Sequence, residues 1–124
     1  MKALEALAEQ LRDEGSPISP RVVATPPAEQ TTGDYALLFE SVREGYLLHY
    51  REPRLLVDDD DDLALLAGDY LYALGLARLA AFEDDRAVVL LADLIGRCAQ
   101  LHTEGREAEV PQLWLDAAEA LGIS

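Results

Sequence analysis

Hydrophobic residues recur every three or four positions in five segments of the chain, which is the spacing of amphipathic helices. The first segment, residues 3–14, has one apolar stripe with charges opposite and stops at Gly15. The stripe consists of Leu4, Leu7, Ala8 and Leu11. Between Gly15 and Gly33 lie four prolines, which exclude a regular helix because proline lacks a backbone donor and has a fixed φ. We therefore predict an N-terminal amphipathic helix at 1–14, a Pro-rich extended connector at 15–33 and a helical domain at 34–124.

The same periodicity predicts four principal helices in the helical domain. They are expected at about 34–51, 60–82, 85–104 and 110–121. Asp34 is placed to cap the first of them, and the run Glu83-Asp84-Asp85 supplies a turn and a cap before the third. The segment from Leu63 to Phe82 is apolar on almost every side, so we expect it to be the central and most buried helix. The predicted fold class is all-α, a bundle of these helices with the N-terminal helix tethered to it.

Charge and composition restrict the possible partners. The 124 residues include 24 acidic and 10 basic side chains, and the net charge of −14 would repel a nucleic acid backbone. We expect no membrane span either, because Asp69, Arg78 or Asp93 interrupts each long apolar stretch. A single cysteine, Cys98, and an N-terminus without a secretion signal indicate a cytoplasmic protein. Nine of the ten basic residues are Arg, a usage typical of GC-rich bacterial genomes.

A run of aspartates before the second principal helix is the candidate metal site. Asp58, Asp59 and Asp62 have an Asp-Asp-x-x-Asp spacing, and carboxylates one helical turn apart can hold Mg²⁺ against a diphosphate. The alternative, which we favour, is that the run caps the helix and benefits from the positive end of its dipole.

The segment after this run, Leu63-Ala64-Leu65-Leu66-Ala67-Gly68-Asp69-Tyr70-Leu71, resembles the Gly-Asp helix of polyprenyl diphosphate synthases, and the similarity extends over residues 58–105. The resemblance implies an all-helical fold in which two Asp-rich motifs bind Mg²⁺ and an allylic diphosphate. Asp58, Asp59 and Asp62 would correspond to the first motif. The second candidate, residues 82–88, lacks its final Asp, and the chain is much shorter than a synthase. The resemblance therefore implies an accessory subunit rather than a working enzyme.

Other potentially chemical residues have simpler structural interpretations. Glu40, Glu44 and His49 lie on one predicted helix but lack the Glu-x-x-His spacing of ferritin-like sites, so we expect the two glutamates on a solvated face. His102 is placed to interact with a helix C-terminus, and Cys98 falls on an apolar face as an inert thiol. Gly68 and Gly75, seven residues apart, would allow another helix to approach closely, within the core or between subunits.

No complete catalytic constellation is present in the sequence. The N-terminal stripe of Leu4, Leu7 and Leu11 must dock on its own bundle or on another molecule, because so short a helix is not stable by itself. We therefore expect a non-catalytic, acidic, helical interaction or accessory subunit that self-associates or binds a protein partner and needs no cofactor. The alternative is Mg²⁺-dependent binding or transfer of a prenyl diphosphate at the aspartate run.

Overall fold

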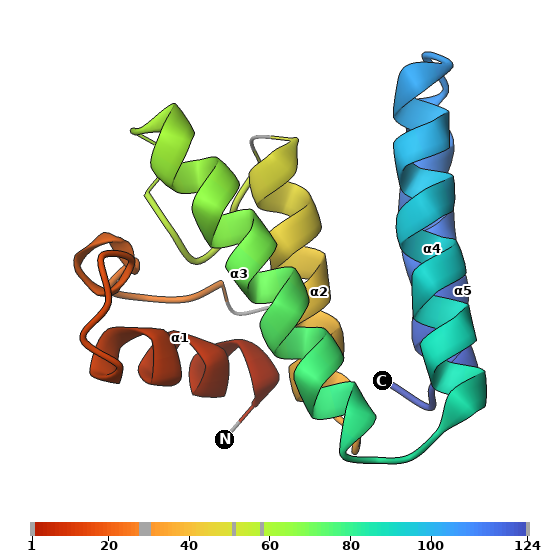
Figure 1. The fold of residues 1–124 in the computed structure, drawn as a ribbon, viewed down its shortest axis with the longest axis horizontal. Coiled ribbons are helices and arrows are strands. Elements are labelled where there is room, and N and C mark those ends of the chain that lie inside the picture. The colour runs from red at the N-terminus through yellow and green to blue at the C-terminus, as the bar shows by residue number, and fades with distance from the viewer. Residues whose placement is uncertain (1, 28–30, 51, 58, 124) are drawn as a thin grey trace.

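The chain folds into five α-helices in a computed structural model that describes residues 2–27, 31–50, 52–57 and 59–123 (Figure 1). The helices are α1 (Ala3–Asp13), α2 (Ala36–His49), α3 (Asp61–Ala80), α4 (Asp85–Thr103) and α5 (Val110–Ala120). Two short 3₁₀ turns, η1 (Ser19–Arg21) and η2 (Glu107–Glu109), complete the regular structure of the described part, which contains no strand. The all-α prediction is confirmed, and each helix lies within two residues of its predicted bounds.

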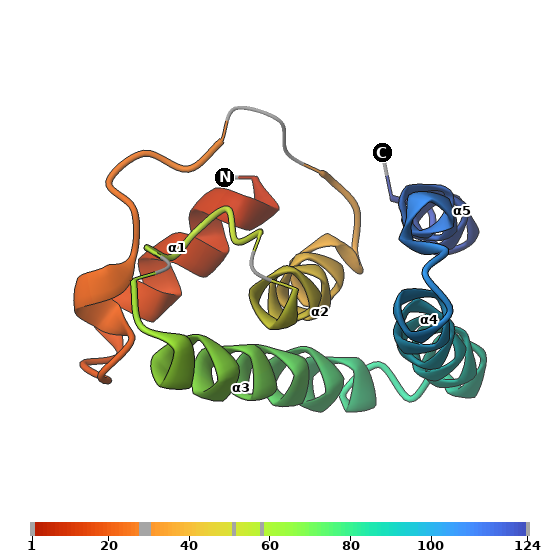
Figure 2. The same cartoon turned by 90° about the horizontal axis from the view of Figure 1, so that it is seen from above.

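Helix α2 lies between two groups of elements. On one side it packs with α1 and α3, and on the other stands the hairpin formed by α4 and α5 (Figure 2). Ten of its fourteen residues are buried, whereas only six of the twenty residues of α3 are. The prediction that 63–82 would be the most buried helix is therefore wrong. The reason is that α1 and the α4–α5 hairpin both cover α2, while most of the long outer side of α3 is left uncovered.

Helix α1 docks on its own chain. Leu4, Leu7 and Leu11 have no exposed surface and share a core with the N-terminal half of α3 and with Leu48 of α2. The Arg12 guanidinium donates to the carbonyl of Val23, which ties the helix to the connector. The leucine stripe is thus part of the core in this structure and is not presented to another molecule.

The connector also folds back on the body of the protein. An isolated antiparallel bridge joins Val22 to Leu56, and the Val23 N–H donates to the Leu55 carbonyl at 2.8 Å. It includes the turn η1 and is therefore less extended than the prolines alone predicted.

Side-chain caps fix the starts of α3 and α4. Asp60 accepts a hydrogen bond from the Leu63 N–H, and Asp84 accepts one from the Ala87 N–H, both at 3.1 Å. These contacts satisfy backbone donors that have no partner within a helix. The predicted cap at Asp34 is wrong, because α2 begins after Tyr35 without any side-chain cap.

Glycines bring α2 and α3 into close contact. A Cβ atom on Gly45 would lie 2.8 Å from the carbonyl oxygen of Gly68, and one on Gly75 would lie 2.5 Å from a methyl group of Val42. Both distances are shorter than atoms tolerate, so only glycine permits this crossing. The predicted close approach is confirmed within the chain, although the contribution of Gly45 was not foreseen.

Candidate functional site

The outer side of α3 carries an exposed row of apolar side chains. Leu65, Leu66, Tyr70 and Leu76 retain 50, 67, 37 and 41 % of their surface. The small residues Ala73 and Ala77 are also exposed, at the spacing of the same helix face. In Figure 2 this helix forms an edge of the molecule, with no other helix beyond it. We refer to these six residues as the α3 face.

Acidic side chains lie at both ends of the α3 face and within it. Asp61 and Asp62 are exposed at its N-terminal end, Asp69 lies within it, and Glu83 follows its C-terminal end. The cation of the helix, Arg78, is half-buried and donates to the side chain of Gln10 on α1. Burial lowers the pKa of Arg78 from its ordinary value. The apolar row is therefore bordered mainly by negative charge.

A hollow of about 440 Å³ lies between the N-terminal half of α3 and the end of α1. Its walls are Glu14, Ser16, Pro17, Ile18, Leu63, Leu66 and Tyr70. The Tyr70 hydroxyl donates to the Glu14 carboxylate at 2.7 Å, and this hydrogen bond raises the pKa of the tyrosine. The hollow could receive one bulky apolar side chain of a partner, beside a carboxylate that could pair with a cation.

The described aspartates of the run at 58–62, which holds the predicted metal site, have different surroundings. Asp58 lies outside the described residues. Asp59 forms an ion pair with Arg21, Asp60 caps α3, and Asp62 is exposed at its first turn. Among the described residues, no three His, Cys, Asp or Glu side chains come together where they could hold a metal ion. Capping is confirmed for Asp60.

A buried ion cluster of Glu40, Glu44 and Arg54 lies under the loop between α2 and α3. Glu40 and Glu44 are 1 and 0 % exposed, so the expectation of a solvated face is wrong. Arg54 donates from Nη1 to Glu40 and from Nε to Glu44, each at 2.9 Å. The backbone N–H groups of Arg54 and Leu55 also donate to Glu44. The cluster fastens the loop to α2 and holds two negative charges against one positive charge.

A cavity of about 610 Å³ separates α2 from α5 next to this cluster. Its lining combines apolar and charged side chains, among them Phe39, Glu40, Arg43, Arg54, Trp114 and Ala118. Glu40 Oε1, Arg54 Nη2 and Thr31 Oγ1 are buried at this cavity without a hydrogen-bond partner among the residues that the structure describes. Buried polar atoms normally find partners, so these three atoms require an explanation.

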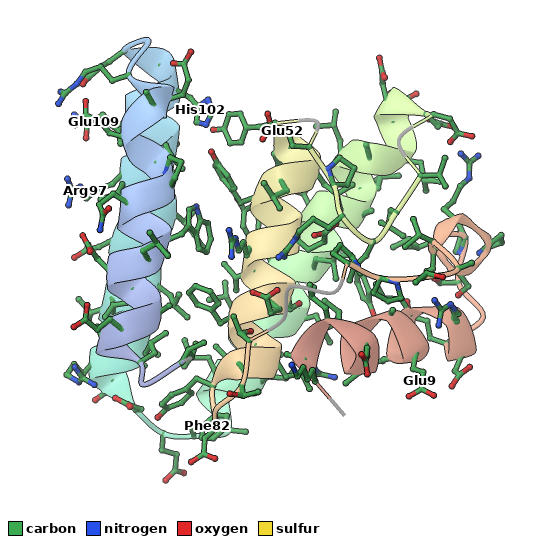
Figure 3. The ribbon with its side chains drawn as sticks, turned by 180° about the vertical axis from the view of Figure 1, so that it is seen from behind. Glu9, Glu52, Phe82, Arg97, His102 and Glu109 are labelled. Atoms are coloured by element: carbon green, nitrogen blue, oxygen red, sulfur yellow. The ribbon has the colours of Figure 1, made fainter. Side chains whose placement is uncertain are left out.

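A second hollow of about 360 Å³ lies toward the C-terminal end of α2, and Arg43 and Trp114 line both this hollow and the cavity. Here the rings of Tyr50 and His102 stack at 3.6 Å between centroids, and His102 Nε2 is hydrogen-bonded to the Tyr46 hydroxyl at 2.6 Å. Figure 3 shows His102 reaching from α4 toward Glu52, beyond the end of α2. Instead of interacting only with its helix terminus, His102 therefore connects the α4–α5 hairpin to α2.

The surroundings of Cys98 and His49, two other candidate residues, indicate roles in the fold. Cys98 is 1 % exposed in the core, and burial raises the pKa of its thiol to about 11, which makes it a poor nucleophile as predicted. His49 stacks on Tyr72 and lies 3.1 Å from a carboxylate oxygen of Asp69. Neither residue is part of a recognisable catalytic arrangement.

Comparison with models of protein families, with curated proteins and with solved structures gives no match. The resemblance of residues 58–105 to polyprenyl diphosphate synthases thus stays a prediction. Among the described residues, α3 is the one helix whose length and composition would suffice to cross a bilayer. A third of this apolar stretch is buried within the protein, and Asp69 lies on the exposed side of α3.

Proposed function

We propose that this chain is a non-catalytic interaction module that binds a basic amphipathic helix of a protein partner on the α3 face. The observation that carries the proposal is the exposed apolar row of α3 within an acidic border. Contiguous apolar surface is costly to expose, and on soluble proteins it commonly marks an interaction site. A partner helix would contribute apolar residues at spacings of three and four, as other helix-in-groove complexes do.

The surface chemistry favours this partner over two others. A net charge of −14 opposes a second copy of the chain and an anionic membrane, whereas it attracts a basic segment and orients it during approach. Ala73 and Ala77 leave room for a partner backbone near the middle and C-terminal part of the face. The hollow beside Leu66 and Tyr70 would hold one anchoring side chain, with Glu14 placed to pair with an adjacent cation.

The proposal can be tested with a designed, fluorescein-labelled 18-residue peptide that has leucines on one helical face and lysines and arginines on the other. Fluorescence anisotropy should show saturable binding that weakens as the salt concentration rises, because salt screens the charge attraction. The double variant Leu65→Gln/Leu66→Gln should weaken binding by about tenfold or more, since burying an aliphatic side chain contributes roughly 1.5–3 kcal/mol. Leu115→Gln is the matched control, because Leu115 is 63 % exposed but lies on α5.

The outcomes separate the possible occupants of the face. Equal binding by the wild type and the double variant, or no binding at millimolar protein, would overturn the proposal. Neutral phosphatidylcholine vesicles serve as a second ligand, and vesicle binding that the double variant abolishes would reassign the face to a membrane. Light scattering coupled to size exclusion should report a monomer. A dimer that the double variant dissociates would instead assign the face to self-association.

A further inference from the structure

The cavity between α2 and α5 lies apart from the α3 face and has the composition of a ligand site. Its volume of about 610 Å³ falls within the range of pockets that enclose small molecules. The walls are mostly apolar, with a few charged groups at defined positions, which is the usual lining of such pockets.

The charges that line the cavity itself balance, and the second hollow adds two carboxylates and one imidazole. Four carboxylates thus line the two spaces, and two guanidinium groups and one imidazole oppose these. The carboxylates belong to Glu40, Glu52, Glu107 and Glu119, and the basic groups to Arg43, Arg54 and His102. Arg54 is already shared between Glu40 and Glu44, so the buried cluster keeps an excess of one negative charge. An isolated buried charge is expensive, and a bound cation would reduce that cost.

Glu40 supplies the specific acceptor. It is 1 % exposed and lines the cavity, and its Oε1 has no hydrogen-bond partner in the described part of the chain, although Oε2 accepts from Arg54. A buried carboxylate oxygen without a donor loses the hydration it had in the unfolded chain and gains nothing in return. An ammonium group offers donors and a positive charge to Glu40 Oε1, whereas the unpartnered Arg54 Nη2 at the same cavity still requires an acceptor.

Aromatic rings provide a second, independent preference for a cation. Phe39 and Trp114 line the cavity with ring centroids 5.5 Å apart, and Tyr46 and Tyr50 line the second hollow. The faces of aromatic rings attract cations, most strongly in surroundings from which water is excluded. Carboxylates and aromatic rings together are the elements with which proteins recognise organic ammonium groups.

We infer that the α2–α5 cavity binds a small organic amine, with its ammonium group at Glu40 and its apolar body against Phe39 and Trp114. Neutral ligands of the same shape should bind more weakly because they leave the excess charge in place. Anionic ligands should bind least, because they would add a second negative charge beside Glu40. This inference does not depend on the function proposed for the α3 face.

The intrinsic fluorescence of the full chain gives a direct test, because Trp114 is its only tryptophan and lines the cavity. Phenethylamine, 2-phenylethanol and 3-phenylpropionate are titrated at neutral pH as the cationic, neutral and anionic probes. The amine should change the emission saturably, with an affinity about tenfold or more above that of the alcohol, as a charge-assisted hydrogen bond implies. No response to any probe, or equal affinity for all three, would overturn the inference.

Two variants assign the binding to the cavity. Glu40→Gln should reduce the affinity for the amine to that for the alcohol, whereas Glu9→Gln, on the exposed side of α1, should not change it. Ala118→Leu places extra atoms at the cavity wall without touching the ion cluster, and should weaken the amine and the alcohol together. If circular dichroism shows that Glu40→Gln does not fold, the Ala118→Leu result decides. Unchanged amine binding in either folded variant refutes the site.

Discussion

Replacing Arg54 by Met tests the role of the buried ion cluster. The substitution keeps an apolar stem of similar length but removes the guanidinium that donates to Glu40 and Glu44. Both carboxylates are almost fully buried, and no other cation pairs with them among the described residues. Removing one partner of a buried ion pair leaves an uncompensated charge, and such changes cost about 3–5 kcal/mol. The Glu44 carboxylate keeps its two backbone donors, which places the expected loss near the lower limit.

The expected loss is therefore about 3 kcal/mol of unfolding free energy, a large part of the roughly 5–15 kcal/mol that a domain possesses. Urea unfolding followed by circular dichroism at neutral pH measures it, and the slope of the transition shows whether the variant still unfolds in one step. Arg106→Met is the matched control, because the Arg106 side chain is 57 % exposed and its ion pairs lie on the surface. Exposed pairs contribute about 0–1 kcal/mol, so this control should change stability little.

Glu40→Gln supplies the complementary comparison. It leaves the pair of Glu44 and Arg54 with balanced charge, so we expect a loss of only about 1 kcal/mol, close to the net value of one hydrogen bond. A loss below about 1 kcal/mol for Arg54→Met, equal to that of the surface control, would refute the argument that the cluster holds the loop to α2. A greater loss for Glu40→Gln than for Arg54→Met would contradict the excess negative charge.

Three further predictions concern the fold. Gly45→Ala should lower the free energy of unfolding, measured in urea, by about 2 kcal/mol. Overpacking costs about 1–3 kcal/mol, and the higher helix propensity of alanine offsets less than about 1 kcal/mol of that cost. Gly96→Ala, which has open space around it, should stabilise the protein by about 0.5–1 kcal/mol, and the same sign for both would contradict the packing argument. Asp60→Ala should cost about 1 kcal/mol through the lost cap of α3, and an unchanged transition would refute that role. The Tyr35 hydroxyl donates to Asp84 and holds the pKa of that carboxyl below its ordinary value. This hydrogen bond stabilises the fold above the unfolded-state pKa of about 4, and the stabilisation is lost as the pH falls through the lower pKa of the folded state. Tyr35→Phe should weaken this acid dependence in pH-resolved unfolding, and an identical profile would contradict it.

The positions of the helices could be predicted from the sequence because periodicity, proline and glycine act locally. The bounds of all five helices follow from the spacing of apolar residues, and the caps at Asp60 and Asp84 follow from a carboxylate before an apolar run. The inert thiol of Cys98 and the close approach at Gly68 were also predictable, because a small or apolar residue on an apolar face indicates burial.

The burial of Glu40 and Glu44 was not predicted, because charged side chains four residues apart usually lie on a solvated helix face. Leu38, Phe39 and Val42 lie on the other sides of α2, whereas Glu40 and Glu44 share one side of the helix with Arg43, so the pattern carried no signal of their burial. Their partner Arg54 lies ten or more residues further along the chain, in the loop before α3, where no helical spacing applies. Only the return of that loop over α2 brings the three charges together.

Which segments are helical, and where they start and end, could be predicted from the sequence, since those features depend on neighbours within a turn or two. The sequence did not determine which apolar face would be covered. Both α2 and α3 are rich in leucine, yet α1 and the α4–α5 hairpin both pack on α2 and leave the α3 face exposed. That choice depends on how the connector and the interhelical turns return the chain, and it decided which residues became core, which became a surface and which enclose a cavity.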